Sequence, residues 1–120
     1  MKSAQPQELG SRTKDFALRI IRLYAALPKT TEAQVIGKQL LRSGTSVGAH
    51  YREARRAKSD ADFISKMEGG LQELDETGYW LEILRDAGIV KAQRLQPLLD
   101  EGEELIAIFV TMVKKVKVKR

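Results

Sequence analysis

The feature that most constrains the fold of this chain is a set of four long stretches with apolar residues at helical spacing, separated by short turn signals. The turn signals are Pro28-Lys29-Thr30, Lys58-Ser59-Asp60 and Gly88. The 120 residues include only three prolines, so little interrupts a helix between these points. No stretch alternates apolar and polar residues with the period of two that is typical of a half-buried strand. The sequence therefore predicts an all-α protein.

Several residues mark where the expected helices begin and end. Pro28 ends the first helix, and Thr31 with Gln34 has the spacing of a capping box at the start of the second. The third opens with a Ser59 side-chain cap followed by carboxylates that suit the helix dipole, and Gly88 suits its exit. We expect helices over about 11–27, 31–57, 59–87 and 92–116.

The short connections between these segments make successive helices antiparallel. They predict an up-down-up-down four-helix bundle. At 120 residues the chain is long enough for one hydrophobic core but not for two. We therefore expect a single domain, with a flexible leader over residues 1–10, the bundle over residues 11–116 and a basic tail over residues 117–120.

Two helices carry apolar residues outside the stripe that one bundle would bury. On the first helix, Leu18, Ile21 and Ala25 form a second apolar face; on the third, Trp80 and Ile83 point away from the core stripe. Either the core stripe is wide, with the tryptophan packed at its edge, or these faces contact other copies of the chain. Two different faces suggest a head-to-tail contact, which closes into a ring at a suitable angle. The candidate interface residues are Leu18, Ile21, Glu73, Glu76, Trp80 and Ile83.

Few residues in the chain are suited to catalysis or to metal binding. There is no cysteine, and His50 is the only histidine, which excludes thiolate and multi-histidine metal sites within one chain. No glycine-rich phosphate loop and no nucleophile elbow is present. Glu73 and Glu76 have a spacing that suits acid–base catalysis, but such a face more commonly pairs with arginines. We predict a protein that is not an enzyme and that has no catalytic residue, cofactor or metal.

A run of small residues, Ser43–Gly48, lies inside the second helix. Gly44 and Gly48 each disfavour the helix by about 1 kcal/mol relative to alanine, so they indicate close approach of another group. That group is either a neighbouring helix, within or between subunits, or a ligand. His50 follows at the margin of the same stripe and is either a neutral, hydrogen-bonded core residue or a titrating group at a subunit interface.

Basic residues gather on one face of the second helix and at the C-terminus. The net charge is +5, from 21 basic and 16 acidic residues. These residues either form a solvated face that pairs with other subunits, or they contact the phosphates of RNA or DNA. The candidate nucleic-acid-binding residues are Lys38, Arg42, Arg52, Arg55, Arg56, Lys58, Lys114, Lys115, Lys117, Lys119 and Arg120.

The cellular compartment is predicted from what the sequence lacks. No segment has the apolar length of a signal peptide or a membrane span, and there is no cysteine. These features predict a cytoplasmic protein with no membrane partner.

Three motifs in the chain resemble those of a known family. They read QLLRS-x-x-SV-x-x-HY-x-EA over residues 39–54, DFI-x-K over residues 62–66 and EL-x-ET-x-YWL over residues 73–81. The chain resembles the bacterial four-helix bundle protein family over about residues 11–115. That family is related to the proteins encoded within ribosomal-RNA intervening sequences. It is also similar in fold to the accessory protein of diversity-generating retroelements.

The resemblance implies an up-down bundle that assembles as a homopentameric barrel. For the retroelement branch it also implies a basic surface that engages nucleic acid and a reverse transcriptase. It assigns Glu53, Glu73 and Glu76 to structural ion pairs. The chain departs from the family at His50, where asparagine is usual, so the details of a buried hydrogen-bond network do not transfer to this position.

Two hypotheses for function follow from the sequence. The first is a non-enzymatic homo-oligomer whose basic residues bind RNA or DNA. The second is a protein-interaction scaffold or adaptor without affinity for nucleic acid.

Overall fold

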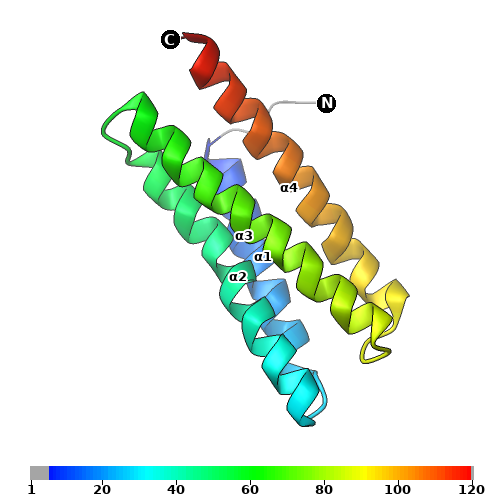
Figure 1. Ribbon diagram of the computed structural model, residues 1–120. Helices are drawn as coiled ribbons and strands as arrows, with labels where there is room; N and C mark the ends of the chain where they lie inside the picture. The colour runs from blue at the N-terminus through cyan, green and yellow to red at the C-terminus, as the bar shows by residue number, and fades with distance from the viewer. Residues whose placement is uncertain (1–5, 120) are drawn as a thin grey trace.

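The computed structural model of the protein describes the backbone of residues 6–119 and the side chains of residues 8–119. The described chain forms four helices, α1 Pro6–Ala25, α2 Thr31–Arg55, α3 Asp60–Asp86 and α4 Ala92–Lys119, and contains no strand (Figure 1). The predicted all-α four-helix architecture in a single domain is therefore confirmed. None of the helices in the described part has both the length and the hydropathy needed to cross a membrane.

The helix ends follow the local chemistry of the turns. The Ser59 hydroxyl accepts a hydrogen bond from the Asp62 amide at 3.0 Å, which confirms the predicted cap of α3. Gly88 has φ of +70°, a left-handed conformation that glycine adopts without steric cost, so it suits the turn after α3. The predicted capping box of α2 is wrong by one residue: Thr30 caps Ala33, while the Gln34 side chain contacts the α1–α2 loop.

The first and last helices are longer than the sequence analysis predicts. α1 begins at Pro6, so residues 6–10 are helical rather than part of a flexible leader. Proline at the first helical position has its φ angle already set for the helix, and Leu9 extends the buried stripe one heptad before Phe16. α4 continues to Lys119, so residues 117–119 are helical rather than a separate tail. Residues 1–5 and Arg120 lie outside the described residues.

Successive helices are antiparallel neighbours in an elongated bundle, and α1 and α4 pack least closely against each other (Figure 1). Arg12 of α1 bridges that looser seam. Its guanidinium donates to Glu101 of α4 at 2.6 Å and 3.0 Å and forms an ion pair with Glu104 at 3.2 Å. This is a part-buried bidentate pair, the geometry in which an Arg–carboxylate contact is most specific.

Close approach of α2 to both neighbours sets the register of the bundle. Gly44 lies against the side chain of Ile20 in α1, and Gly48 lies against Thr13. On the other side, the Thr77 hydroxyl of α3 donates to the buried Ser43 hydroxyl at 3.0 Å. The small-residue run Ser43–Gly48 is therefore used for tight helix packing within the protomer.

Candidate nucleic-acid interface

One end of the bundle gathers most of the predicted nucleic-acid-binding residues. The end of α2, the α2–α3 loop and the end of α4 lie at the same end in Figure 1. We call this surface the basic end and define it by its exposed cations. They are Arg52, Arg55, Arg56, Lys58, Lys114, Lys115, Lys117 and Lys119.

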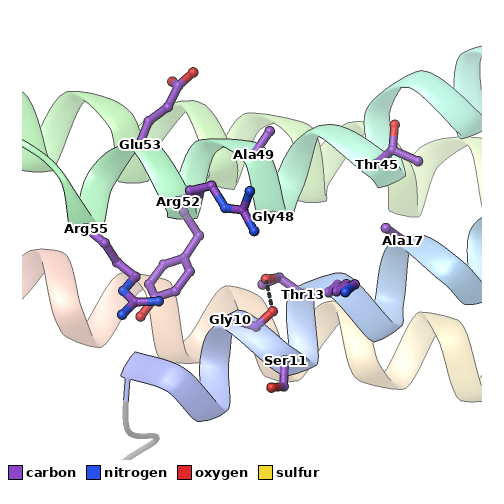
Figure 2. A pocket seen from close by; sticks show the side chains of 12 residues that line it. Gly10, Ser11, Thr13, Ala17, Thr45, Gly48, Ala49, Arg52, Glu53 and Arg55 are labelled. Carbon is purple, nitrogen blue, oxygen red and sulfur yellow. Dashed lines mark hydrogen bonds between the residues drawn. The ribbon is translucent and has the colours of Figure 1, made fainter.

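A groove between α1 and α2 forms one side of the basic end. This α1/α2 groove has a volume of about 620 Å³ and is lined by small residues together with Lys14, Arg52 and Arg55 (Figure 2). The Arg52 side chain extends from α2 toward α1, whereas the carboxylate of Glu53 points away from α1 (Figure 2). The groove therefore presents more positive than negative charge to a ligand that enters between the helices.

A second hollow, of about 680 Å³, lies under the α2–α3 loop. It is lined by Lys58 and by Lys119 of α4, and it shares Tyr51 and Arg55 with the α1/α2 groove. Because Arg55 lines both hollows, the groove on α2 and the end of α4 belong to one continuous surface. Two clusters that are about 60 residues apart in the sequence are thus brought together by the fold.

Most cations of the basic end are not neutralised within the described chain. Only Lys117 has a carboxylate within 4.0 Å there, that of Glu68 at 3.5 Å. The guanidinium of Arg55 lies 6.0 Å from the centre of the Tyr51 ring, a cation–π distance that leaves its charge in place. The other members of the basic end form no ion pair among residues 8–119.

Arg42 and Lys38 do not belong to the basic end. Arg42 pairs across α2 and α3 with Glu73 at 3.3 Å and with Glu76. The indole N–H of Trp80 donates to the same Glu76 carboxylate at 3.1 Å. Lys38 is exposed near the opposite end of α2. The charge of Arg42 is thus offset within the protomer, and Glu73 and Glu76 act as its ion-pair partners.

The ion pairs and hydrogen bonds that link Arg42, Glu76 and Trp80 make the stability of the fold depend on pH. The Arg42 hydrogen bond, followed by that from Trp80, lowers the pKa of Glu76 below its ordinary value of 4.5. A carboxyl with a depressed folded-state pKa stabilises the fold above its unfolded-state pKa, and this contribution is lost as the pH falls through the folded-state value. We expect the urea midpoint of Glu76→Gln to fall less than that of the wild type on acidification below about pH 4.5. An acid response equal to that of the wild type would contradict this role, and Glu103→Gln, an exposed carboxyl without an ion pair among the described residues, is the matched control.

The predicted interface residues lie on two separate faces of the protomer. On α1, Leu18 and Ile21 are 39% and 44% exposed. On α3, Trp80 is half-buried, packs partly against the core and stands edge-on to Tyr79 at 5.0 Å. Trp80 therefore packs at the edge of the core, as one of the two alternatives predicted, and part of its side chain is exposed. Ile83 is half-buried beside it.

His50 lies between α2 and α3. Its Nε2 atom is 3.8 Å from the Glu73 carboxylate, and its Nδ1 atom is buried without a hydrogen-bond partner in the described part of the chain. Its ring fills the space beside Gly69, where an added Cβ would lie 2.8 Å away. His50 therefore packs between the two helices beside the ion pairs of Arg42. Among the described residues, no cluster of three or more histidine, aspartate or glutamate side chains is suited to hold a metal ion.

Sequence reasoning missed three residues of these surfaces. Lys14 joins the α1/α2 groove only because Thr13 packs on Gly48, a contact between helices that no local pattern predicts. The other two are large hydrophobic residues that are exposed: Tyr79 is 55% exposed and Val35 is 58% exposed. A search for large apolar residues off the core stripe of each helix would have found Val35 and Tyr79.

Comparisons with known proteins agree with the family resemblance of the motifs. A family model described as 23S rRNA-intervening sequence protein matches residues 7–111, a range that contains all three motifs. Among solved structures, the chain is similar to a protein of unknown function from the S23 ribosomal protein family of Bacteroides thetaiotaomicron, with 36% sequence identity and a TM-score of 0.85. That match covers 91% of this chain and 97% of that chain. A comparison with curated proteins found no match.

Proposed function

The chain belongs to the family of 23S rRNA-intervening sequence proteins, and from this premise we propose that it is a non-enzymatic, cytoplasmic protein that binds RNA or DNA through its basic end. The observation that carries the proposal is the gathering on one surface of arginines and lysines from α2, the α2–α3 loop and α4, most of which form no ion pair among residues 8–119. Such a surface attracts phosphates over long range and releases counterions on binding.

The side chains of the basic end are suited to contact phosphates rather than bases. Arginine and lysine side chains on a helix fix a strand by its backbone and carry little sequence information by themselves. Two aromatic residues line the second hollow beside these cations, and neither is fully exposed for base stacking: Tyr51 is buried and Phe63 is half-buried. We therefore expect binding that depends on salt more strongly than on sequence.

Fluorescence anisotropy with labelled RNA and DNA of two unrelated sequences tests the proposed function. We expect the affinity to fall steeply as the salt concentration is raised. The slope of log affinity against log salt concentration should be steeper by about 0.7 for each phosphate contact to a single strand. The two sequences should give similar slopes. Absence of binding at low salt, or binding that is insensitive to salt, would reject the proposal.

We also propose that the protein assembles with itself, as a homopentameric ring in which α1 of one copy packs against α3 of the next. The exposed Leu18 and Ile21 on one face and the surface of Trp80 and Tyr79 on another support a head-to-tail contact of two unlike faces. Ring closure would also bring as many basic ends into one particle as there are copies, so the total positive charge of the particle would rise with the copy number.

Trp80→Ala tests this assembly. The change removes a large aromatic contact surface, so we expect light scattering with size-exclusion chromatography to show a smaller species than the wild-type protein. Val118→Ala is the matched control, because Val118 is apolar and 85% exposed but lies at the end of α4. Equal masses for the wild type and Trp80→Ala would refute the assignment of this face.

A second candidate function is that of a protein-interaction scaffold, with a reverse transcriptase among the partners that the family resemblance implies. Exposed apolar residues near the opposite end of the bundle, Val35 and Tyr79, favour it. Pull-down after nuclease treatment separates the two functions. Retention of one protein partner together with no affinity for nucleic acid would favour the scaffold.

A further inference from the structure

We propose that the α1/α2 groove binds a terminal phosphate monoester, the group found at the end of a nucleic-acid strand and on a free nucleotide. For strand ends the inference rests on the proposed function, and it specifies which group of the strand enters the groove.

The charges that line the groove match a dianion better than a monoanion. Lys14, Arg52 and Arg55 line it, and Glu53 is the only carboxylate among its lining residues. Glu53 points away from α1, so its charge faces the rim rather than the space between the helices (Figure 2). A phosphate monoester carries a charge of about −1.5 to −2 at neutral pH, whereas each internal diester of a strand carries about −1.

The two helices that form the groove both carry short side chains along it. Ala17 of α1 and Ala49 of α2 line the groove and add little side-chain bulk, whereas Gly48 is covered by Thr13 and Gly10 by Arg55. Of the lining hydroxyls, Thr13 and Thr45 donate to the backbone carbonyls of Gly10 and Leu41 at 3.1 Å and 2.7 Å. Ser11 has no such bond among the described residues, and its side chain points away from α2 (Figure 2).

The position of the groove suits the end of a strand. Its volume of about 620 Å³ lies within the range of sites that hold small ligands, so it accommodates more than a phosphate alone. Arg55 stands between the groove and the second hollow, which is lined by Lys58 and Lys119. A strand whose terminal phosphate lies beside Arg52 and Lys14 can therefore continue over Arg55 toward the end of α4.

The test compares RNA oligomers of one sequence with a 5′-phosphate or a 5′-hydroxyl, together with adenosine monophosphate and adenosine as free ligands. We expect the phosphorylated strand to bind about tenfold more tightly, since the 5′-hydroxyl strand lacks the terminal phosphate monoester and the charge-assisted hydrogen bonds that it accepts. The preference should fall on acidification from about pH 7.5 to about pH 5, because the second phosphate pKa is about 6.

Matched variants locate the site. Arg52→Gln and, separately, Lys14→Gln should abolish the preference, whereas Arg56→Gln should keep it. Arg56 follows α2 one turn after Arg52 and carries the same charge, but it does not line the groove. All three residues are exposed, and unchanged circular dichroism and thermal melting would show that the variants are folded. A preference that survives in both groove variants would overturn the assignment.

The outcomes separate this inference from the proposed function. Equal affinity for the two RNA ends would overturn the inference and leave nucleic-acid binding in place. Binding of adenosine monophosphate but of no RNA would support the groove as a phosphate-monoester site for free nucleotides and would overturn RNA binding. Binding of none of the four ligands would overturn both the inference and RNA binding.

Discussion

Replacing Arg52, Arg55 and Lys58 together by glutamine is expected to lower the affinity for single-stranded RNA by about a hundredfold at about 0.1 M salt. Each lost phosphate contact removes about 0.7 from the slope of log affinity against log salt, so three contacts remove about 2 from the slope and about two decades of affinity at that salt. These residues line the α1/α2 groove and the second hollow. Anisotropy over a salt series measures the affinity and the slope together.

The control for this variant removes the same charge from the other end of the bundle. Arg22, Lys29 and Arg94 are exposed near the α1–α2 loop and the start of α4, and none of them has an ion pair among residues 8–119. Their replacement by glutamine should lower affinity much less and leave the slope nearly unchanged, because direct contacts set the slope. Equal losses for both triple variants would show that only net charge matters and would contradict the basic end as the binding surface.

Two identical substitutions at glycines are expected to change stability in opposite directions. At Gly44, an added Cβ would lie 2.7 Å from Cγ1, 2.9 Å from Cγ2 and 3.2 Å from Cβ of Ile20. Ile20 is fully buried and branched at Cβ, so it cannot rotate away, and overpacking of this kind costs about 1–3 kcal/mol. At Gly78 no atom lies within 4 Å of an added Cβ, and alanine favours the helix by about 1 kcal/mol.

Urea unfolding of the two variants measures this difference directly. We expect Gly44→Ala to lower the urea midpoint and Gly78→Ala to raise it. Alanine increases helix propensity at both positions, but only at Gly44 does the added methyl group clash with a neighbouring side chain. The m-values should match that of the wild type, which would show that the native and unfolded surfaces are unchanged. A rise of both midpoints would mean that α1 and α2 are not packed as closely at Gly44 as the structure shows, and a fall of both would mean that the space around Gly78 is not open.

The fold could be predicted from the sequence where local chemistry decides the outcome. The Ser59 cap and the exit at Gly88 depend on neighbouring residues alone, and both are confirmed. The start of α1 could not be predicted because proline and glycine near the N-terminus favour a turn locally. What extends the helix to Pro6 is the burial of Leu9 against other helices, which is a tertiary effect.

The candidate site was predictable only in part for the same reason. Helical spacing places Arg52 and Arg55 on neighbouring faces of α2, and Lys58 follows three residues later in the α2–α3 loop, so their clustering needs no knowledge of the other helices. The pairing of Arg42 with Glu73 joins residues 31 positions apart on different helices. Which arginines of α2 remain unpaired therefore depends on the α2–α3 register, and that register was not accessible from the sequence.

Hydrogen exchange of the whole protein with and without RNA is the most direct test that the basic end is the functional surface. We expect added RNA to slow exchange at residues 10–17, 48–60 and 112–119, which form the α1/α2 groove, the α2–α3 loop and the end of α4. Exchange near the α1–α2 and α3–α4 loops, at residues 26–33 and 86–95, should remain unchanged. Protection confined to those two loops would contradict the assignment of the basic end.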